Sequence, residues 1–246
     1  MIAITGGGTG GHLVIARAIK EELNRQGIFP VYIGSTGGQD RQWFENDSGF
    51  SERYFLESKG VVNKKGLRKL ASLFNTIKLA LTCKKLLRHH NVQAVFSVGG
   101  YSAAPASFGA LFARIPLFIH EQNAVEGKLN HLLKPFSKAF FGSYQTDAIQ
   151  TDYPVSQAFF AVRRKRTYLS TIIFLGGSQG ATFINQLARS LAPLLHQKGI
   201  RIIHQTGKKE FEEMQMFYHN ANIPADVFDF SYNMVQKLEQ ADFAIS

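Results

Sequence analysis

The sequence has a single cysteine, Cys83, so no disulfide can form within the chain. It has no run of about 18 apolar residues, and it therefore predicts no transmembrane helix. Its first residues lack the basic start and long apolar stretch of a signal peptide. No Gly-Lys-Ser/Thr follows either of its glycine-rich turns, which excludes a Walker phosphate loop. These absences predict a cytoplasmic protein without a disulfide framework.

Acidic residues are scarce in the first part of the chain. The 246 residues hold 28 Lys/Arg and 18 Asp/Glu, which gives a net charge of +10. Residues 1–162 carry 18 basic and 11 acidic side chains, whereas residues 167–246 carry 6 and 7. Residues 59–90 hold nine Lys/Arg and no acid. A one-sided basic surface suits a phosphorylated ligand or an anionic membrane. Nucleic-acid recognition motifs are absent, and we expect no nucleic acid partner.

Two segments share one pattern, a short apolar strand followed by a glycine-rich turn and an amphipathic helix. The first is Met1–Thr5 with the turn Gly6–His12, and the second is Thr171–Leu175 with the turn Gly176–Ala181. Other apolar strands alternate with helical segments along the chain. Such alternation predicts an α/β fold with two Rossmann-like domains, each built on a parallel sheet.

The expected domains are residues 1–162 and 163–246, because the basic residues 163–166 precede the strand of the second pattern. In open parallel sheets, ligands bind where the strands end at their carboxyl side. The glycine turns occupy such positions, as do Gly99-Gly100-Tyr101 and His120–Asn123. We therefore expect them to line a crevice.

The first turn, here called the first glycine turn (Gly6–His12), allows close backbone approach to a phosphate at a helix N-terminus. An NAD site also needs an acid at the end of the second strand, and the nearest acid is Asp40. NAD is therefore disfavoured. His12 begins the helix, where a neutral ring can accept a proton. The ordinary alternative is a helix-start residue that packs on the turn.

Four polar residues, His120 to Asn123, directly follow a strand, which favours a hydroxyl-rich ligand such as a sugar over simple loop capping. The second glycine turn (Gly176–Ala181) adds a hydroxyl and an amide. One interpretation is that Ser178 holds a diphosphate while Gln179 contacts a sugar. The alternative is a tight turn in which Ser178 caps the helix. No metal-ligand spacing is present among the histidines.

Residues 67–89 read as one helix. Leu70, Phe74, Ile77 and Leu81 share one face, expected to be the core face, and Leu79 and Leu86 lie opposite. A helix with apolar residues on its outer side, among basic residues and no acids, can lie on an anionic bilayer. An ordinary surface helix with two exposed leucines is the alternative.

The two glycine turns, Gly99-Gly-Tyr101 and His120-Glu-Gln-Asn123 together resemble the MurG family, the UDP-N-acetylglucosamine transferases of peptidoglycan lipid II synthesis. The resemblance covers essentially the whole chain. It implies a GT-B architecture of two Rossmann-like domains. It also implies inverting transfer of N-acetylglucosamine from UDP-N-acetylglucosamine to the 4-hydroxyl of the muramyl sugar of lipid I, without a metal or other cofactor. The implied location is the cytoplasmic face of the bacterial membrane, with residues 59–90 on the lipid surface.

The resemblance also implies residue roles. His12 is the candidate general base, and Glu121 is a second catalytic candidate. The expected substrate-binding residues of the acceptor side and cleft are Thr9, Gly10, Gly11, Gly99, Gly100, Tyr101 and Asn123. Those of the donor side are Ser178, Gln179 and Ser231.

In that family, a further turn, a helix and an acidic residue for the donor ribose follow the strand that here ends at Ser246. The resemblance therefore implies a donor domain that is incomplete in this sequence. A second hypothesis follows from it, namely a non-catalytic, membrane-recruiting acceptor half of a split transferase.

Overall fold

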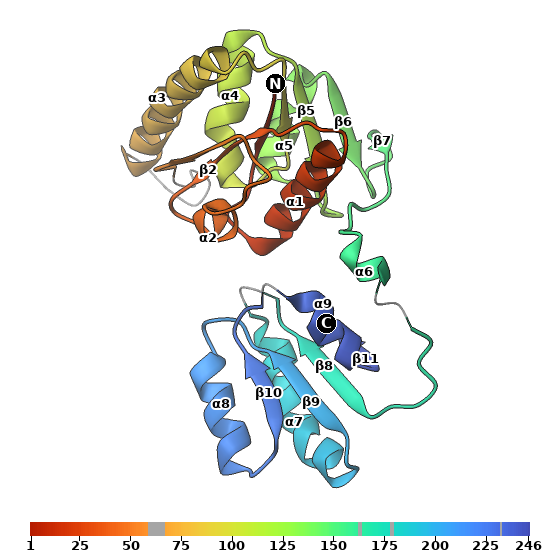
Figure 1. Ribbon diagram of the computed structural model, residues 1–246. Coiled ribbons are helices and arrows are strands. Elements are labelled where there is room, and N and C mark those ends of the chain that lie inside the picture. Colours follow the sequence, from red (N-terminus) through yellow and green to blue (C-terminus); the bar gives the residue numbers. More distant parts are fainter. Residues whose placement is uncertain (59–66, 162–163, 178–179, 232) are drawn as a thin grey trace. The chain divides into compact units, whose positions relative to one another are not determined.

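The computed structural model describes residues 1–58, 67–161, 164–177, 180–231 and 233–246. These residues form two compact units, Met1–Ser156 and Gln157–Ser246. Each unit is a parallel sheet covered by helices, as the alternating sequence pattern predicts (Figure 1).

The first unit is a seven-stranded parallel sheet of order β3-β2-β1-β4-β5-β6-β7. Its strands are β1 Ile2–Thr5, β2 Val31–Ser35, β3 Glu52–Leu56, β4 Ala94–Ser97, β5 Leu117–Glu121, β6 Ala139–Gly142 and β7 Ile149–Gln150. Its helices are α1 Gly10–Arg25, α2 Asp40–Phe44, α3 Leu67–His89, α4 Ala104–Ala113 and α5 Lys128–Leu133, with short 3-10 turns at Tyr101–Ala103 and Lys134–Phe136.

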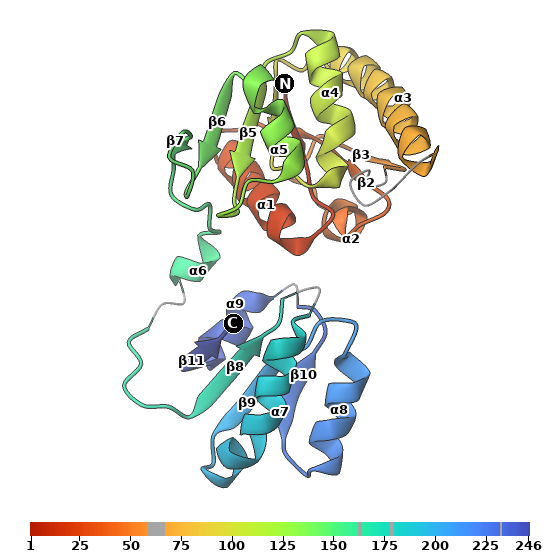
Figure 2. The same cartoon turned by 180° about the vertical axis from the view of Figure 1, so that it is seen from behind.

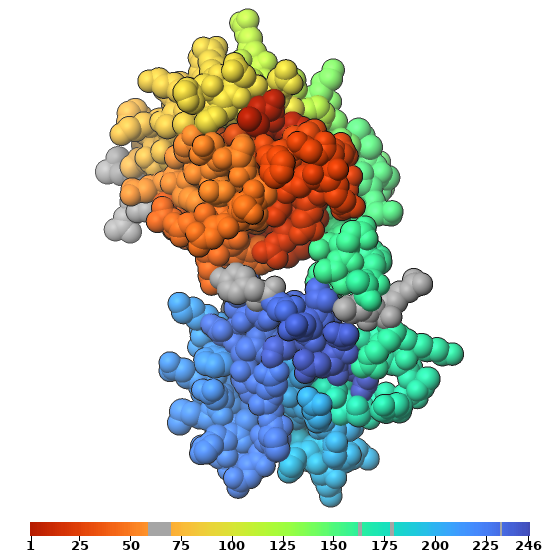
Figure 3. Space-filling view, viewed as in Figure 1, coloured from red at the N-terminus to blue at the C-terminus, as the bar shows by residue number. Residues whose placement is uncertain are grey.

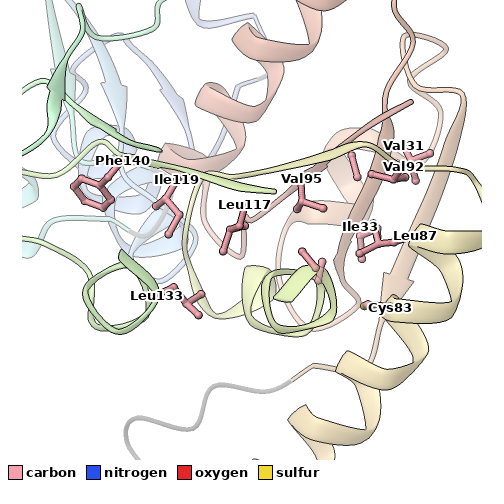
Figure 4. Close-up of a cluster of buried hydrophobic side chains, with 13 residues drawn as sticks. Val31, Ile33, Cys83, Leu87, Val92, Val95, Leu117, Ile119, Leu133 and Phe140 are labelled. Carbon is pink, nitrogen blue, oxygen red and sulfur yellow. The ribbon is translucent and has the colours of Figure 1, made fainter. Parts of the chain in front are cut away.

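Helices α1 and α2 cover one face of this sheet, and α3, α4 and α5 cover the other (Figures 1 and 2). Alternate strand residues supply the two cores, because successive side chains of a strand point to opposite faces. Figure 4 shows the core on the α3–α5 face, where Val31, Val95 and Ile119 pack with Leu87 and Leu133. On the α1 face, Ile4 and Tyr32 pack with Leu13, Phe44 and Phe50 of the helices and following loops.

Helix α3 has the predicted bounds, but the assignment of its faces is wrong. Its buried residues are Thr76, Ala80, Cys83 and Leu87, whereas Phe74 is 72% exposed. The small buried residues let α3 lie close to α4: a Cβ on Gly109 of α4 would be 2.7 Å from Cys83 Cβ. The exposed apolar residues form what we call the α3 apolar face, composed of Leu70, Leu73, Phe74, Ile77 and Leu81.

The sequence predicts two leucines on the outer side of α3. Leu79 and Leu86 are only partly exposed. Small residues at the contact let the two helices approach closely, and Phe74 and Ile77 of α3 stay exposed on another side. None of the helices in the described ranges is long and apolar enough to cross a membrane.

The second unit is a four-stranded parallel sheet of order β10-β9-β8-β11. Its strands are β8 Thr171–Leu175, β9 Arg201–Gln205, β10 Ala225–Phe228 and β11 Phe243–Ile245. Its helices are α6 Ala158–Ala161, α7 Thr182–Gln197, α8 Phe211–Asn220 and α9 Met234–Gln240. Strand β8 has the predicted bounds. On α7, Ile184 and Leu195 are buried, whereas Leu194 is 49% exposed.

Candidate functional site

Both glycine turns lie at switch points of their sheets, where the strand order reverses. In the first unit the order reverses between β1 and β4, and the first glycine turn follows β1 while Gly99 and Gly100 follow β4. In the second unit it reverses between β8 and β11, and the second glycine turn follows β8. Crevices at such points are the usual ligand sites of open α/β sheets.

In the first unit the two loops after β1 and β4 touch through their backbones. Gly7 N donates a hydrogen bond to Gly99 O at 3.2 Å. A Cβ on Gly6, which has φ +120°, would lie 2.6 Å from that same oxygen. A Cβ on Gly100, which has φ +78°, would lie closer still to Gly7 O. Only glycine permits this approach, so the structure brings the predicted residues Gly99 and Gly100 to the first glycine turn.

Tyr101 closes the side of the first glycine turn. A Cβ on Gly8 would be 2.6 Å from Tyr101 Cε1, and one on Gly38 would be 2.8 Å from its hydroxyl. Burial raises the pKa of Tyr101, and a hydrogen bond with Ser35 partly opposes this shift. The ring is therefore a neutral wall of the turn.

His12 lies in the first turn of α1 and is partly buried. Its Nδ1 is 3.0 Å from Oγ1 of Thr9, the N-cap residue of the helix. Burial lowers the pKa of His12, and the charges of Glu121 and Asp40 partly offset that shift. In the neutral tautomer in which Nδ1–H donates to Thr9, Nε2 is the nitrogen that can take a proton.

Glu121 is fully buried at the end of β5. Its Oε1 accepts hydrogen bonds from the backbone N and the side-chain Nδ2 of Asn123, both at 2.9 Å. Its Oε2 accepts from Gly127 N at 2.8 Å and Asn130 Nδ2 at 2.9 Å. Backbone and side-chain amides therefore occupy both oxygens of this carboxylate. This geometry favours a role for Glu121 in holding the loop of Asn123.

The neighbours of Glu121 offer polar atoms instead. His120 is 3% exposed and Gln122 is 5% exposed. Among the described residues, neither ring nitrogen of His120 and neither amide atom of Gln122 has a hydrogen-bond partner. Burial lowers the pKa of His120, so its ring is neutral. Buried polar groups are normally hydrogen-bonded, and these atoms are available to a polar ligand or to water.

The second glycine turn is attached to the end of β9. Gly176 N donates to Gln205 O at 2.9 Å. A Cβ on Gly180, which has φ +79°, would be 2.6 Å from Thr206 O. The N-cap of α7 is Ala181, which is not the residue that the capping alternative named. The predicted donor residues Ser178 and Gln179 lie outside the described residues.

A buried polar network supports this turn from behind. Asn185 Nδ2 donates to Thr206 O at 3.1 Å and to Glu210 Oε2 at 3.0 Å. Asn185 Oδ1 is 3.0 Å from Nε2 of His204, whose Nδ1 is 3.1 Å from the Tyr218 hydroxyl. Burial lowers the pKa of His204 to about 4. The network therefore holds the loop after β9 against the second glycine turn while His204 is neutral.

Ser231, the remaining donor-side candidate, follows β10. Its Oγ accepts a hydrogen bond from Asn233 N at 3.1 Å, just before α9. In the described ranges there is no cluster of three or more His, Cys, Asp or Glu side chains arranged to hold a metal ion.

Sequence reasoning missed three side chains that position these loops, namely Asp40, Asn130 and Asn185. All three are buried, at 0%, 2% and 1% exposure. Each lies on a helix outside the glycine motifs, and no local spacing marks it as a partner of a turn. Gly7 and Gly34, where an added Cβ would meet the Asp40 carboxylate, are the one sequence feature that points to Asp40. They can be interpreted in this way only when the fold is known.

Two parallel α/β units, each with a glycine turn at its switch point, are the architecture of GT-B glycosyltransferases. The chain belongs to glycosyltransferase family 28. The family's N-terminal domain matches residues 2–141, and its C-terminal domain matches residues 171–246.

Curated relatives extend this similarity over the whole chain. The chain is 55% identical over 245 residues to the Campylobacter jejuni subsp. doylei "UDP-N-acetylglucosamine--N-acetylmuramyl-(pentapeptide) pyrophosphoryl-undecaprenol N-acetylglucosamine transferase". That match covers 100% of this chain and 71% of the relative. The protein of the same name from Wolinella succinogenes is 52% identical, with 100% of this chain and 73% of the relative covered.

A solved structure shows the same fold. The crystal structure of Acinetobacter baumannii MurG is similar with a TM-score of 0.69 and 27% identity. The match covers 99% of this chain and 72% of that one. The predicted fold class and the prediction of a MurG-like glycosyltransferase are therefore confirmed.

Proposed function

We propose that the chain transfers N-acetylglucosamine from UDP-N-acetylglucosamine to the 4-hydroxyl of the muramyl sugar of lipid I, with inversion, and so forms lipid II. The observation that carries this proposal is the 55% identity to a transferase of that name across the full length of the chain. The two glycine turns support it, because transfer between two diphosphate-linked substrates requires a site for each.

His12 is the general base in this proposal. Inverting transfer requires that the acceptor hydroxyl lose its proton as it attacks the anomeric carbon. His12 Nε2 takes that proton while Nδ1–H donates to Thr9 Oγ1. The imidazolium that forms is stabilised by the charges of Glu121 and Asp40.

The other predicted residues bind and orient the substrates. Gly10 and Gly11, in the first turn of α1, and Tyr101 face the acceptor, while Asn123 is held by Glu121 to contact a sugar. On the donor side, Ser178, Gln179 and Ser231 contact UDP-N-acetylglucosamine. The N-terminus of α7, a 16-residue helix, offsets the charge of the departing UDP.

A direct assay tests the transfer. The chain is incubated with radiolabelled UDP-N-acetylglucosamine and a lipid I analogue, and labelled lipid II is measured. We expect transfer by the parent chain and a loss of at least ~100-fold in kcat for His12→Ala. Absence of transfer under conditions in which the Campylobacter jejuni relative is active refutes the proposal. Binding of the lipid I analogue without transfer then favours the non-catalytic acceptor module.

We further propose that transfer requires no divalent metal, because the helix N-terminus supplies positive potential at the donor diphosphate. EDTA should then leave the initial rate of transfer unchanged. A rate that falls with EDTA and returns with Mg²⁺ contradicts this part of the proposal.

We also propose that the α3 apolar face docks on the anionic, cytoplasmic surface of the bacterial membrane, where lipid I lies. Five large apolar side chains are exposed on one helix face (Figure 3 shows α3 at the surface of its unit). Lys78, Lys85 and Arg88 are also exposed on this helix. Each basic residue near an anionic surface contributes about 1 kcal/mol to binding.

Two double variants separate apolar docking from charge. Phe74→Glu with Ile77→Glu removes apolar contact, whereas Ala71→Glu with Thr82→Glu adds the same charge at exposed positions outside the α3 apolar face. Partitioning to phosphatidylglycerol-containing vesicles should fall at least ~10-fold further for the first pair, because each large apolar side chain contributes ~2 kcal/mol. Equal losses for both pairs contradict docking through the apolar face.

A further inference from the structure

Asp40 lies behind the first glycine turn with its carboxylate fully buried. Its Oδ2 accepts a hydrogen bond from Gly8 N at 2.6 Å, and its Oδ1 accepts one from Ser35 N at 3.0 Å. The Tyr32 hydroxyl lies within hydrogen-bond distance of both Oδ1, at 3.1 Å, and Gly6 O, at 3.0 Å. This one side chain therefore ties the turn after β1 to the end of β2.

Two glycines make room for this carboxylate. A Cβ on Gly7 or on Gly34 would lie 2.7 Å from Asp40 Oδ1. Both positions therefore exclude a side chain, although Gly34 needs no unusual backbone angle. The two glycines thus leave room for the Asp40 carboxylate, and Leu13 and Tyr32 border the same space.

The carboxylate also changes what the turn can offer a ligand. The N–H groups of Gly7 and Gly8 are directed to Gly99 O and to Asp40. A phosphate-binding turn presents such groups to its anion. Here they serve to hold the turn in place, which leaves the N–H groups of the first turn of α1 as the donors for an anion.

A short covalent path leads from this anchor to the proposed base. Gly8 is followed by Thr9, the N-cap of α1, and the Thr9 hydroxyl contacts His12 Nδ1 at 3.0 Å. A displacement of Gly8 therefore moves both the helix start and the hydroxyl that orients the ring. The charge of Asp40 also acts on His12, together with that of Glu121 from β5.

We propose that Asp40 is a positioning residue of the transfer reaction: its buried carboxylate fixes the Gly8 amide and thereby the helix start that carries His12. The proposal rests on the proposed function. Asp40 touches neither substrate, and it acts through the turn and through its charge on the imidazole.

Asp40→Asn is the test, and Asp47→Asn is the matched control. Asp47 likewise accepts a hydrogen bond from a glycine amide, Gly49 N at 2.8 Å, and pairs with Lys20 at 2.7 Å. Both variants should lower the midpoint of thermal unfolding. Only Asp40→Asn should lower kcat, by ~100-fold, because small displacements of a reacting group have effects of that size. The KM for UDP-N-acetylglucosamine should stay within ~3-fold of the parent value.

The pH profile separates positioning from stability. Loss of the Asp40 charge should lower the pKa of His12, so the acidic limb of kcat/KM should move to lower pH in Asp40→Asn and stay in place in Asp47→Asn. A folded Asp40→Asn protein with the parent kcat and the parent acidic limb overturns the inference.

Two further measurements make the result independent of assay and folding problems. If the parent chain shows no transfer, the proposed function fails, and NMR titration of His12 with amide exchange at Gly8 still decides the placement of Asp40. If Asp40→Asn does not fold, Tyr32→Phe removes one partner of the carboxylate and should lower kcat ~5-fold with an unchanged donor KM. An unchanged kcat for that folded variant contradicts the inference.

Discussion

Acidification should weaken the second unit through His204. This side chain is fully buried and its pKa is lowered to about 4 from an ordinary value of 6.5. Asn185 Nδ2 donates to two acceptors, so its Oδ1 must accept from His204 Nε2–H, and His204 Nδ1 accepts from the Tyr218 hydroxyl. The neutral ring is thus fully hydrogen-bonded. A second proton on Nδ1 would face a hydroxyl hydrogen and would carry a charge into the core.

The sign and size of the effect follow from linkage. The unfolded chain binds a proton at His204 below pH 6.5, whereas the folded chain binds it only near pH 4. Stability from this group is therefore complete above pH 6.5 and decreases as the pH falls toward 4. One pKa unit corresponds to about 1.4 kcal/mol, so the free energy of unfolding should fall by about 2 kcal/mol between pH 7 and pH 5.

Hydrogen–deuterium exchange of the β8 and β9 peptides measures this loss within the second unit. Exchange limited by unfolding should be ~30-fold faster at pH 5 than at pH 7 after correction for intrinsic rates. His204→Gln removes the titrating group, so its exchange should lack most of this pH dependence, even though the variant is less stable overall. An equally steep pH dependence in His204→Gln would refute the reasoning.

Three further predictions concern the first unit. Gly8→Ala should abolish transfer and destabilise the unit by ~2 kcal/mol or more in urea unfolding, because φ is +84° and the new Cβ would meet the Tyr101 ring. Thr9→Val should lower kcat ~5-fold, whereas Thr9→Ser should keep the parent kcat, since only the hydroxyl contacts His12. Equal kcat values for the two variants contradict the orienting role of the hydroxyl. Cys83, whose pKa burial raises to about 12, should resist a thiol reagent at pH 8 until the protein unfolds, and rapid labelling of the folded protein would contradict its burial.

The strand, turn and helix pattern could be predicted from the sequence because it is local. The bounds of β8 and α3 follow from short apolar runs and from a long segment with no helix breaker. The contacts between the first glycine turn and Gly99 agree with the expectation that loops after neighbouring strands meet. His12 is a candidate from the sequence alone because it directly follows a run of glycines whose phosphate-binding chemistry the sequence indicates.

The direction of the α3 faces could not be predicted in this way. The helix is apolar on more than one side, and its periodicity alone does not say which side is buried. The packing of α3 on α4 determines which side is buried. Ala80 and Cys83 pack against Gly109 of α4, and Phe74 stays exposed. The residues exposed for membrane docking are therefore those of the α3 apolar face, not Leu79 and Leu86.

Glu121 and Asp40 also show which features follow from the sequence and which depend on the tertiary structure. The sequence by itself determined two parallel α/β units with a glycine turn and a histidine at the start of α1, because each of these features depends on residues close in the chain. Only the tertiary structure decided that Glu121 accepts four hydrogen bonds and that Asp40 accepts the Gly8 amide. Whether a buried carboxylate acts on a substrate or holds a loop depends on which donors reach it. Asp40 accepts from Gly8, which lies 32 residues earlier in the chain, whereas the donors to Glu121 lie within nine residues and reach it only because the following loop folds back on it.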